Sequence, residues 1–300
     1  MRIETFSILT GSAACNARCP FCISKMTPPE GVELKVPPVN WRNFMKACRL
    51  AELKGVTTAM FTGKGEPLLF PGQITGFLEA MAHFNFPMIE IQTNGIKISE
   101  NPEEYSHHLQ NWHDFGLTTV AISIVHYEPE KNREIYLPYK KQYIDLPALI
   151  RAIRKVGRDG EMKGLSVRLT CIGADGYVDS VEKLQKLIEF ARANLVEQLT
   201  FTPVNKPDEE HSHDKAAWDW INKHHLKDHQ LREIMDFVKK NGSHLLTLQH
   251  GAKVYDVNGQ NLCLNACLTV HPDKDDLRNL IFYPDGSIRY YWQYPGALLF

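Results

Sequence analysis

The chain has 300 residues, of which 43% are hydrophobic and 23% are charged, and its formal net charge is −1. This length can bury one large core, and the balanced charge argues against a surface that binds extended nucleic acid. No segment approaches the roughly 20 consecutive apolar residues of a membrane span, so we expect no membrane association. Seven cysteines, an odd number, do not suit a disulfide framework and favour a reducing, cytoplasmic location.

Apolar strand patterns alternate with amphipathic helix patterns through the first two thirds of the chain. The predicted strands span residues 3–10, 57–62, 88–93, 118–125, 165–172 and 198–203. The predicted helices span residues 41–54, 71–84, 102–115, 146–157 and 180–194. This order predicts βα units and a parallel α/β sheet, with too few strands for a closed eight-stranded barrel.

The alternation ends at a polar segment, residues 205–214, which is typical of a boundary loop. We therefore expect a main domain over residues 1–204 and a small α+β extension over residues 205–300. The elements predicted in the extension are a helix at 230–240 and strands at 245–249, 253–257, 280–283 and 287–291. The dipeptide Asp285-Gly286 predicts a tight hairpin turn between the last two strands.

Three cysteines follow the first predicted strand in the order C-x-x-x-C-x-x-C. The segment reads Cys15-Asn16-Ala17-Arg18-Cys19-Pro20-Phe21-Cys22. Structural zinc usually takes four protein ligands, whereas an iron–sulfur cubane held by three thiolates leaves one iron free to bind another molecule. The spacing therefore favours a catalytic cluster, and a zinc loop or an incidental group of cysteines is the alternative.

This spacing, with Phe21 before the third cysteine, resembles the signature of the radical S-adenosylmethionine (SAM) superfamily. The resemblance implies a partial (β/α)6 barrel over about the first two hundred residues. It also implies a [4Fe-4S] cluster held by Cys15, Cys19 and Cys22, with SAM as the second cofactor. In that family one electron from the cluster cleaves SAM, and the 5′-deoxyadenosyl radical that forms abstracts a hydrogen atom from the substrate.

The loop after the second predicted strand carries a further likeness to this superfamily. The segment Thr62-Gly63-Lys64-Gly65-Glu66-Pro67 resembles the family's Gly-Gly-Glu-Pro segment, with Lys64 in place of a glycine. The resemblance implies that Gly65 and Glu66 lie near the SAM amino group. Taken alone, the segment is also typical of an ordinary Gly-rich turn.

The resemblance assigns five more residues to SAM. Thr93 and Asn94 end the third predicted strand, in a Thr-Asn-Gly sequence that is also common in turns. Ser123 and Arg168, on the fourth and fifth strands, are expected at the SAM ribose and carboxylate, and Phe21 at its adenine. An arginine that points inward from an apolar strand needs a partner, because an unpaired buried charge is costly, and the alternative is a solvated side chain.

Four residues near the expected mouth of the barrel are candidate substrate contacts. His126 and Tyr127 follow the fourth strand, and the polar loop over residues 128–141 either covers the substrate or is only a solvated lid. Arg278 and Arg289 flank the predicted hairpin and suit bidentate recognition of an anion, or else decorate its solvent face.

Two cysteines of the extension raise the question of a second cluster. Cys263 and Cys267 stand at C-x-x-x-C spacing, which resembles the auxiliary-cluster extension of radical SAM enzymes such as GTP 3′,8-cyclase. No further cysteine follows them, so a cluster-free extension is the alternative.

The resemblance is to the nucleotide-modifying branch, which includes GTP 3′,8-cyclase and viperin-like enzymes, and it predicts a small, nucleotide-like substrate. It also implies an electron donor such as flavodoxin or ferredoxin. A peptide-modifying maturase is the second enzymatic hypothesis. A non-catalytic zinc or iron–sulfur regulatory binding protein is the hypothesis from a different class.

Overall fold

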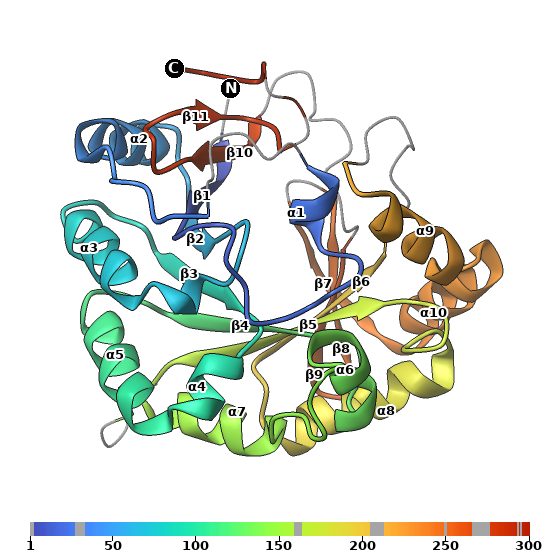
Figure 1. Cartoon of the computed structure of the whole chain (residues 1–300). Coiled ribbons are helices and arrows are strands. Elements are labelled where there is room, and N and C mark those ends of the chain that lie inside the picture. The colour runs from blue at the N-terminus through green and yellow to red at the C-terminus, as the bar shows by residue number, and fades with distance from the viewer. Residues whose placement is uncertain are drawn as a thin grey trace.

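The computed structural model describes residues 3–27, 34–158, 164–204, 213–248, 251–265, 277–292, 294 and 296–300. Within these residues eleven strands form one sheet, in the order β11-β10-β1-β2-β3-β4-β5-β6-β9-β8-β7. Strands β1 to β6 are parallel neighbours in chain order. The sheet curves around a central space and carries helices on its outer side (Figure 1). The predicted α/β partial barrel is confirmed, since the sheet formed by the described residues ends at β11 and β7 and does not close.

The elements of the barrel and of the extension follow one another along the chain. The strands are β1 (Ile3–Leu9), β2 (Thr58–Thr62), β3 (Met88–Thr93), β4 (Thr119–Ile124), β5 (Ser166–Gly173), β6 (Gln198–Pro203), β7 (Ser243–Thr247), β8 (Lys253–Val257), β9 (Gln260–Leu264), β10 (Leu277–Phe282) and β11 (Ile288–Arg289). The helices are α1 (Ile23–Met26), α2 (Trp41–Leu53), the 3₁₀ helix η1 (Pro67–Leu69), α3 (Pro71–Met81), α4 (Ile96–Glu100), α5 (Pro102–Asp114), α6 (Pro129–Tyr136), α7 (Leu146–Lys155), α8 (Val181–Ala193), α9 (Lys215–His224) and α10 (Asp228–Asn241). The six predicted barrel strands all occur, and their ends lie within about one residue of those expected.

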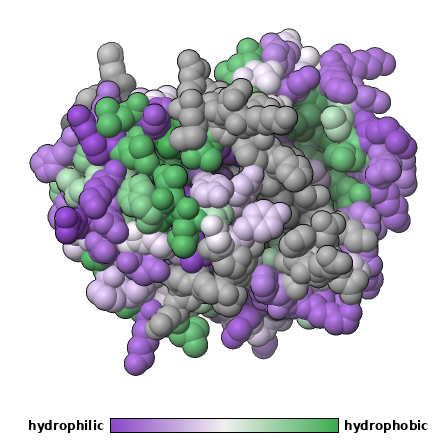
Figure 2. All heavy atoms as spheres, turned by 90° about the horizontal axis from the view of Figure 1, so that it is seen from above, coloured by the Kyte–Doolittle hydropathy of each residue, from purple (hydrophilic) through white to green (hydrophobic). Residues whose placement is uncertain are grey.

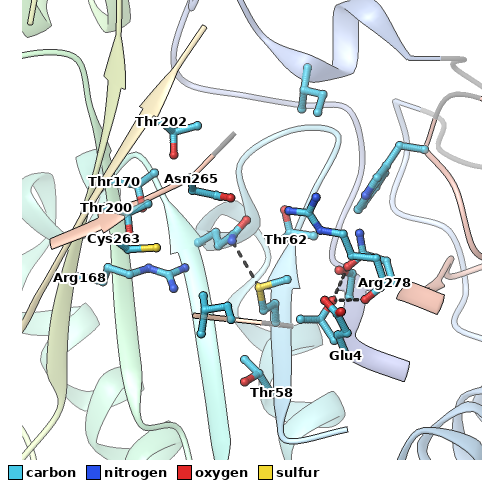
Figure 3. Close-up of a pocket in the computed structure, with 18 of the residues that line it drawn as sticks. Glu4, Thr58, Thr62, Arg168, Thr170, Thr200, Thr202, Cys263, Asn265 and Arg278 are labelled. Atoms are coloured by element: carbon cyan, nitrogen blue, oxygen red, sulfur yellow. Dashed lines mark hydrogen bonds between the residues drawn. The ribbon is translucent and has the colours of Figure 1, made fainter. Parts of the chain in front are cut away.

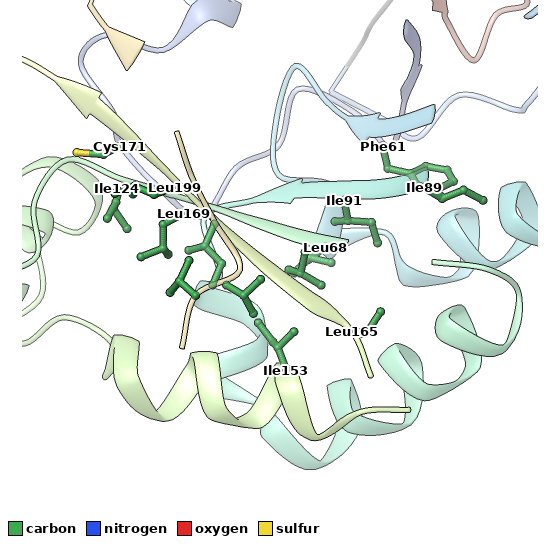
Figure 4. Close-up of a cluster of buried hydrophobic side chains, with 14 of the residues drawn as sticks. Phe61, Leu68, Ile89, Ile91, Ile124, Ile153, Leu165, Leu169, Cys171 and Leu199 are labelled. Carbon is green, nitrogen blue, oxygen red and sulfur yellow. The ribbon is translucent and has the colours of Figure 1, made fainter. Parts of the chain in front are cut away.

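The hydrophobic core lies between the sheet and the outer helices. On β5, Leu169 and Cys171 are fully buried in this layer, and Ile153 of α7 packs in the same layer (Figure 4). The alternate residues Arg168 and Thr170 point to the central space. Because side chains alternate across a strand, one face of the sheet is apolar and the other, inside the barrel, is polar. This arrangement leaves the interior free for hydrophilic contacts.

The extension continues the barrel sheet on both of its flanks. Strand β10 pairs in parallel with β1, and strand β9 pairs in parallel with β6. The predicted hairpin is confirmed: β10 and β11 are antiparallel, and Gly286 has a φ of 94° that favours glycine. Residues far apart in the sequence thereby line the same central space.

A helix replaces part of the loop that was expected after the fourth strand. Helix α6 occupies residues that the sequence predicts to be a polar covering loop. Pro129 lies in its first turn, where a missing N–H costs nothing, and the helix buries Ile135 and Tyr136. Its short apolar stripe explains why the sequence pattern did not indicate a helix.

The surface mixes hydrophilic and hydrophobic side chains. Figure 2 shows hydrophilic residues around the margin of one face and a hydrophobic patch on the side where Figure 1 draws α2. Among the described residues, no helix combines the length and apolar composition that a bilayer crossing requires.

Candidate active site

The cysteine loop joins β1 to α1 at the end of the barrel where the parallel strands finish. Cys15 is exposed, and Cys19 and Cys22 are half-buried. Burial raises the pKa of the Cys19 thiol, and the nearby charges of Cys22 and Cys15 raise this pKa further. This mutual influence indicates that the three sulfurs share one neighbourhood. The Cys22 Sγ also lies 2.8 Å from the Ser24 Oγ.

Hydrogen-bond donors that the described residues leave without partners lie around the cysteine loop. Three buried polar atoms at the loop, Asn16 Nδ2, Tyr136 Oη and Tyr143 Oη, have no hydrogen-bond partner among the described residues. The charge of Cys19 raises the pKa of both tyrosines, after the larger effect of burial. Three thiols beside unpaired donors suit a sulfide-containing cluster, because such clusters accept hydrogen bonds at sulfur.

Gly65 is required where the loop after β2 crosses the cysteine loop. A Cβ atom at Gly65 would lie 1.9 Å from the carbonyl oxygen of Ala14. The next residue, Glu66, donates its backbone N–H to the same oxygen at 2.9 Å. The two loops are therefore fixed against each other by direct backbone contact.

The Glu66 carboxylate connects this crossing to the end of β3. Its Oε1 accepts hydrogen bonds from Thr93 Oγ1 at 2.6 Å and Leu68 N–H at 3.1 Å, and its Oε2 accepts one from Asn94 N–H at 3.0 Å. Burial raises the pKa of Glu66, and these hydrogen bonds oppose that rise. Asn94 in turn donates from Nδ2 to Asn16 Oδ1 at 2.7 Å. Three of the segments that the sequence singles out thus meet at one place.

Phe21 packs against Trp220 of helix α9. Its ring centroid lies 5.2 Å from that of Trp220, which stacks on His224 with a centroid distance of 4.4 Å. Trp220 was not predicted, since a helical pattern gives no sign of contact with a loop two hundred residues away. The sequence expectation of an adenine contact for Phe21 is not tested by this packing.

A polar pocket of about 580 Å³ fills the barrel interior. At one end it is lined by Lys64 and by Ile23 and Thr27, the first residue and the C-cap of helix α1, which directly follows Cys22. The buried Lys64 ammonium donates a hydrogen bond to Thr27 Oγ1. Deeper in the pocket, Figure 3 shows Arg168 beside Cys263, facing Thr62 and Arg278 across the space. The pocket therefore reaches from the cysteine loop into the barrel.

Arg168 points inward and forms an ion pair with Glu90 of β3. Glu90 is 2% exposed, and burial raises its pKa while the charge of Arg168 lowers it. Glu90 was missed by sequence reasoning, although an acidic residue within the apolar strand Met88–Thr93 was a usable signal. Arg168 thus points inward and has a buried partner, in place of the outward, solvated orientation, and its contact with the SAM carboxylate stays a prediction.

The other candidate residues lie at different places. His126 is buried outside the lining of the pocket, its Nδ1 accepts from Glu128 N–H at 3.0 Å, and its ring packs on Tyr127. Arg289 is buried with its guanidinium 4.4 Å from the centroid of Tyr283, so the solvated alternative does not hold for it. Ser123 is half-buried on the inner face of β4.

The two extension cysteines and Arg278 complete the set of candidates. Cys263 and Arg278 both line the pocket, and burial lowers the pKa of Arg278 while the charge of Glu4 raises it. Cys267 lies outside the described residues. The auxiliary cluster therefore stays a prediction.

The sequence model of the Radical SAM superfamily matches residues 9–164. The chain belongs to the radical SAM superfamily. A [4Fe-4S] cluster and SAM are the cofactors of this superfamily. No curated protein sequence matches the chain.

Three solved structures share the fold of this chain, and one of them, HemN, is described as a radical SAM enzyme. SuiB of Streptococcus suis bound to the precursor peptide SuiA is 14% identical, with 96% of this chain and 59% of SuiB covered and a TM-score of 0.60. The anSMEcpe structure with bound AdoMet and the Kp18Cys peptide is 13% identical, with 99% and 77% covered and a TM-score of 0.57. Coproporphyrinogen III oxidase (HemN) of Escherichia coli is 14% identical, with 81% and 54% covered and a TM-score of 0.50. The chain spans 59% of the length of SuiB, and at these identities the likeness shows the fold alone.

Proposed function

We propose that this enzyme reductively cleaves SAM and uses the 5′-deoxyadenosyl radical to abstract hydrogen from a small, nucleotide-like substrate inside the barrel. One observation carries the proposal. The cysteine loop, the Gly65–Glu66 loop and the Thr93–Asn94 loop are tied together by hydrogen bonds at the mouth of a polar pocket of about 580 Å³. Active sites of barrel enzymes occupy this end of the strands.

In this proposal Cys15, Cys19 and Cys22 hold the cluster. When bound, the cluster and SAM supply the electron transfer and the radical, which the protein itself cannot provide. The Glu66 carboxylate holds the ends of β3 and η1 in place, so that the backbone near Gly65 is presented to the SAM amino group. Phe21, fixed by Trp220, closes one side of the loop and keeps water from it.

The roles of the other candidate SAM residues follow from where they lie on the strands. Thr93, Asn94 and Ser123 lie at or near the strand ends and face the SAM ribose and methionine. An external donor such as flavodoxin or ferredoxin supplies the electron. The polar interior supports a hydrophilic substrate, in keeping with the GTP 3′,8-cyclase and viperin-like branch, since the lining carries arginines and hydroxyls in place of a packed aliphatic core.

A peptide is the second candidate substrate. Strand β7 lies at an edge of the sheet, all five of its residues are exposed, and within the described residues no strand pairs with its outer side. A peptide that added to this edge by backbone hydrogen bonds would run toward Thr247 and Leu248, which line the pocket. SuiB and anSMEcpe have the same fold and were solved with peptides, which supports including this candidate.

Anaerobic reconstitution tests the proposed function. We expect about four iron and four sulfide per chain, absorbance near ~400 nm, and 5′-deoxyadenosine after reduction in the presence of SAM. Cys19→Ala is expected to lose cluster and 5′-deoxyadenosine formation while the barrel stays folded, because the Cys19 side chain packs at the margin of the core and is not one of its fully buried members.

Cys48→Ala is the matched control for that variant. Cys48 is fully buried in α2, where a cysteine acts as a small apolar side chain, so its replacement removes a thiol without touching the loop. Zinc in place of iron, or unaltered 5′-deoxyadenosine formation by Cys19→Ala, would reject the proposal.

A further inference from the structure

Arg168 reaches its partner across a whole strand. The register places Arg168 of β5 opposite Ala121 of β4, and Ala121 opposite Gln92 of β3. The small side chain of Ala121 leaves room for the guanidinium to cross β4 and meet Glu90 of β3 in an ion pair. Gln92 Nε2 donates a second hydrogen bond to the same Glu90 oxygen at 3.3 Å. One carboxylate oxygen of Glu90, Oε1, thereby accepts hydrogen bonds from both Arg168 and Gln92.

Glu90 positions the Arg168 guanidinium but does not occupy all of its hydrogen-bond donors. Arg168 Nε is buried and has no hydrogen-bond partner among the described residues, although Arg168 lines the pocket. A buried donor without an acceptor is costly, and a buried ion pair is a poor source of stability. An oxygen acceptor inside the pocket would satisfy this donor.

The pocket wall around Arg168 is rich in hydroxyl and amide groups. Figure 3 shows Thr170, Thr200, Thr202 and Asn265 on the same side as Arg168. Arg278 and Lys64 add two more cationic side chains to the lining, and the carboxylate of Glu4 lies beside Arg278. Such a wall complements a ligand that has several hydroxyls and a negative charge, because threonine and asparagine both donate and accept hydrogen bonds.

The ion pair directs the Arg168 guanidinium away from the strand end at Thr93. The register places Arg168 level with Gln92, one residue before Thr93, the last residue of β3. Its partner Glu90 stands three residues before Thr93, a distance of about 10 Å along a strand. This direction, into the barrel, favours a contact with the substrate over one with the SAM carboxylate.

We propose that the Arg168 guanidinium, positioned by Glu90, binds an oxyanion of the substrate. The substrate is then a small, hydroxyl-rich molecule that carries a phosphate or a carboxylate. This inference rests on the proposed function, which places the substrate in the interior pocket. Arginine suits the role because its planar fork meets two oxygens of a phosphate or carboxylate at once.

Binding to the reconstituted, SAM-loaded enzyme tests this inference by calorimetry. The probes are the four common ribonucleoside 5′-monophosphates against their nucleosides, and glucuronate against glucose. We expect at least one acid to bind tenfold or more tightly than its neutral counterpart. The first set detects a phosphate as the source of the oxyanion, and the second detects a carboxylate.

The double variant Glu90→Gln/Arg168→Gln removes the ion pair and keeps its shape, since replacing both partners avoids an unpaired buried charge. We expect it to lose at least tenfold in affinity for the acid and to bind SAM as the unaltered enzyme does. The control is Glu197→Gln/Arg154→Gln, which removes a half-buried ion pair of 2.8 Å that lies outside the pocket and is expected to change neither affinity. Thermal unfolding checks that both variants fold.

Two results overturn the inference. One is that the acids bind no better than the neutral probes. The other is that the double variant keeps its affinity for the acid, including the case in which it loses affinity for SAM alone. The formation of 5′-deoxyadenosine on reduction is measured in the same samples. Its absence alongside intact acid binding would reject the proposed function and leave the oxyanion site standing.

Discussion

Single residues fix the loops that converge at the mouth of the barrel. Gly65 has no side chain, so the carbonyl of Ala14 can pack directly against it. The Glu66 carboxylate accepts hydrogen bonds from Leu68, Thr93 and Asn94. These contacts join residues that are close in space and far apart in the sequence. The position of the cysteine loop therefore depends on residues that do not themselves bind the cluster.

The variant Gly65→Ala tests this dependence. Its Cβ would lie 1.9 Å from the Ala14 oxygen, so one of the two loops must move. We expect stability to fall by about 1–3 kcal/mol, as for other overpacked sites, and SAM affinity to fall at least tenfold. Denaturant unfolding and SAM titration of the reconstituted enzyme measure the two effects.

Gly72→Ala is the control, because a Cβ at Gly72, in the first turn of α3, would meet no atom within 4 Å. There we expect a small gain in stability of about 0.4–1 kcal/mol and unchanged SAM affinity. Equal SAM affinities in the two variants would show that the crossing of the loops does not position the cofactor.

At the scale of elements, helix α9 covers the cysteine loop. Trp220 of α9 contacts Phe21, and α9 lies near α1 in Figure 1. The helix belongs to the extension, so the extension contributes to the environment of the cluster as well as to the sheet.

Trp220→Ala is expected to expose the loop and to speed loss of the cluster in air several-fold, because the aromatic contact over Phe21 is removed. Decay of the absorbance near ~400 nm in aerated buffer measures this rate. Trp218→Ala is the control, since Trp218 lies on the same helix beneath Lys215 and makes no aromatic contact with Phe21. If the cluster absorbance decays at the same rate in both variants, helix α9 does not protect the cluster from air.

The sequence predicted the strands well where apolar and polar residues alternate strongly. It predicted elements poorly where contacts between distant segments determine the structure. β3 and β6 begin and end at the predicted residues, because apolar and polar positions alternate along them. Helices α6 and α9 were missed, since each is short and has few buried apolar residues. The need of Arg168 for a partner followed from its charge, and the acidic residue within the apolar strand β3 was a signal for Glu90, but only the strand register brings the two side chains together.

At the scale of the whole molecule, one sheet contains strands from both ends of the chain. β1 pairs with β10, and β6 pairs with β9, so the barrel strands have neighbours from the extension on both flanks. Figure 1 shows the two chain ends on the same side. The division at residue 204 thus separates segments that share hydrogen bonds along two strands, and we propose that the second segment completes the substrate side of the barrel.

Expression of residues 1–204 alone tests how far the two segments depend on each other. The truncation leaves β1 and β6 with unpaired N–H and C=O groups, and such edges pair with other chains. It also removes the covering side chains Arg278, Cys263 and Trp220 from the interior and the loop. We expect residues 1–204 to aggregate and to lack a cooperative thermal transition, and the 300-residue chain to be monodisperse with one transition, as light scattering and calorimetry will show. A monomeric, cooperatively unfolding 1–204 segment would instead establish the barrel as an independent domain, because its edges would then need no partner strands.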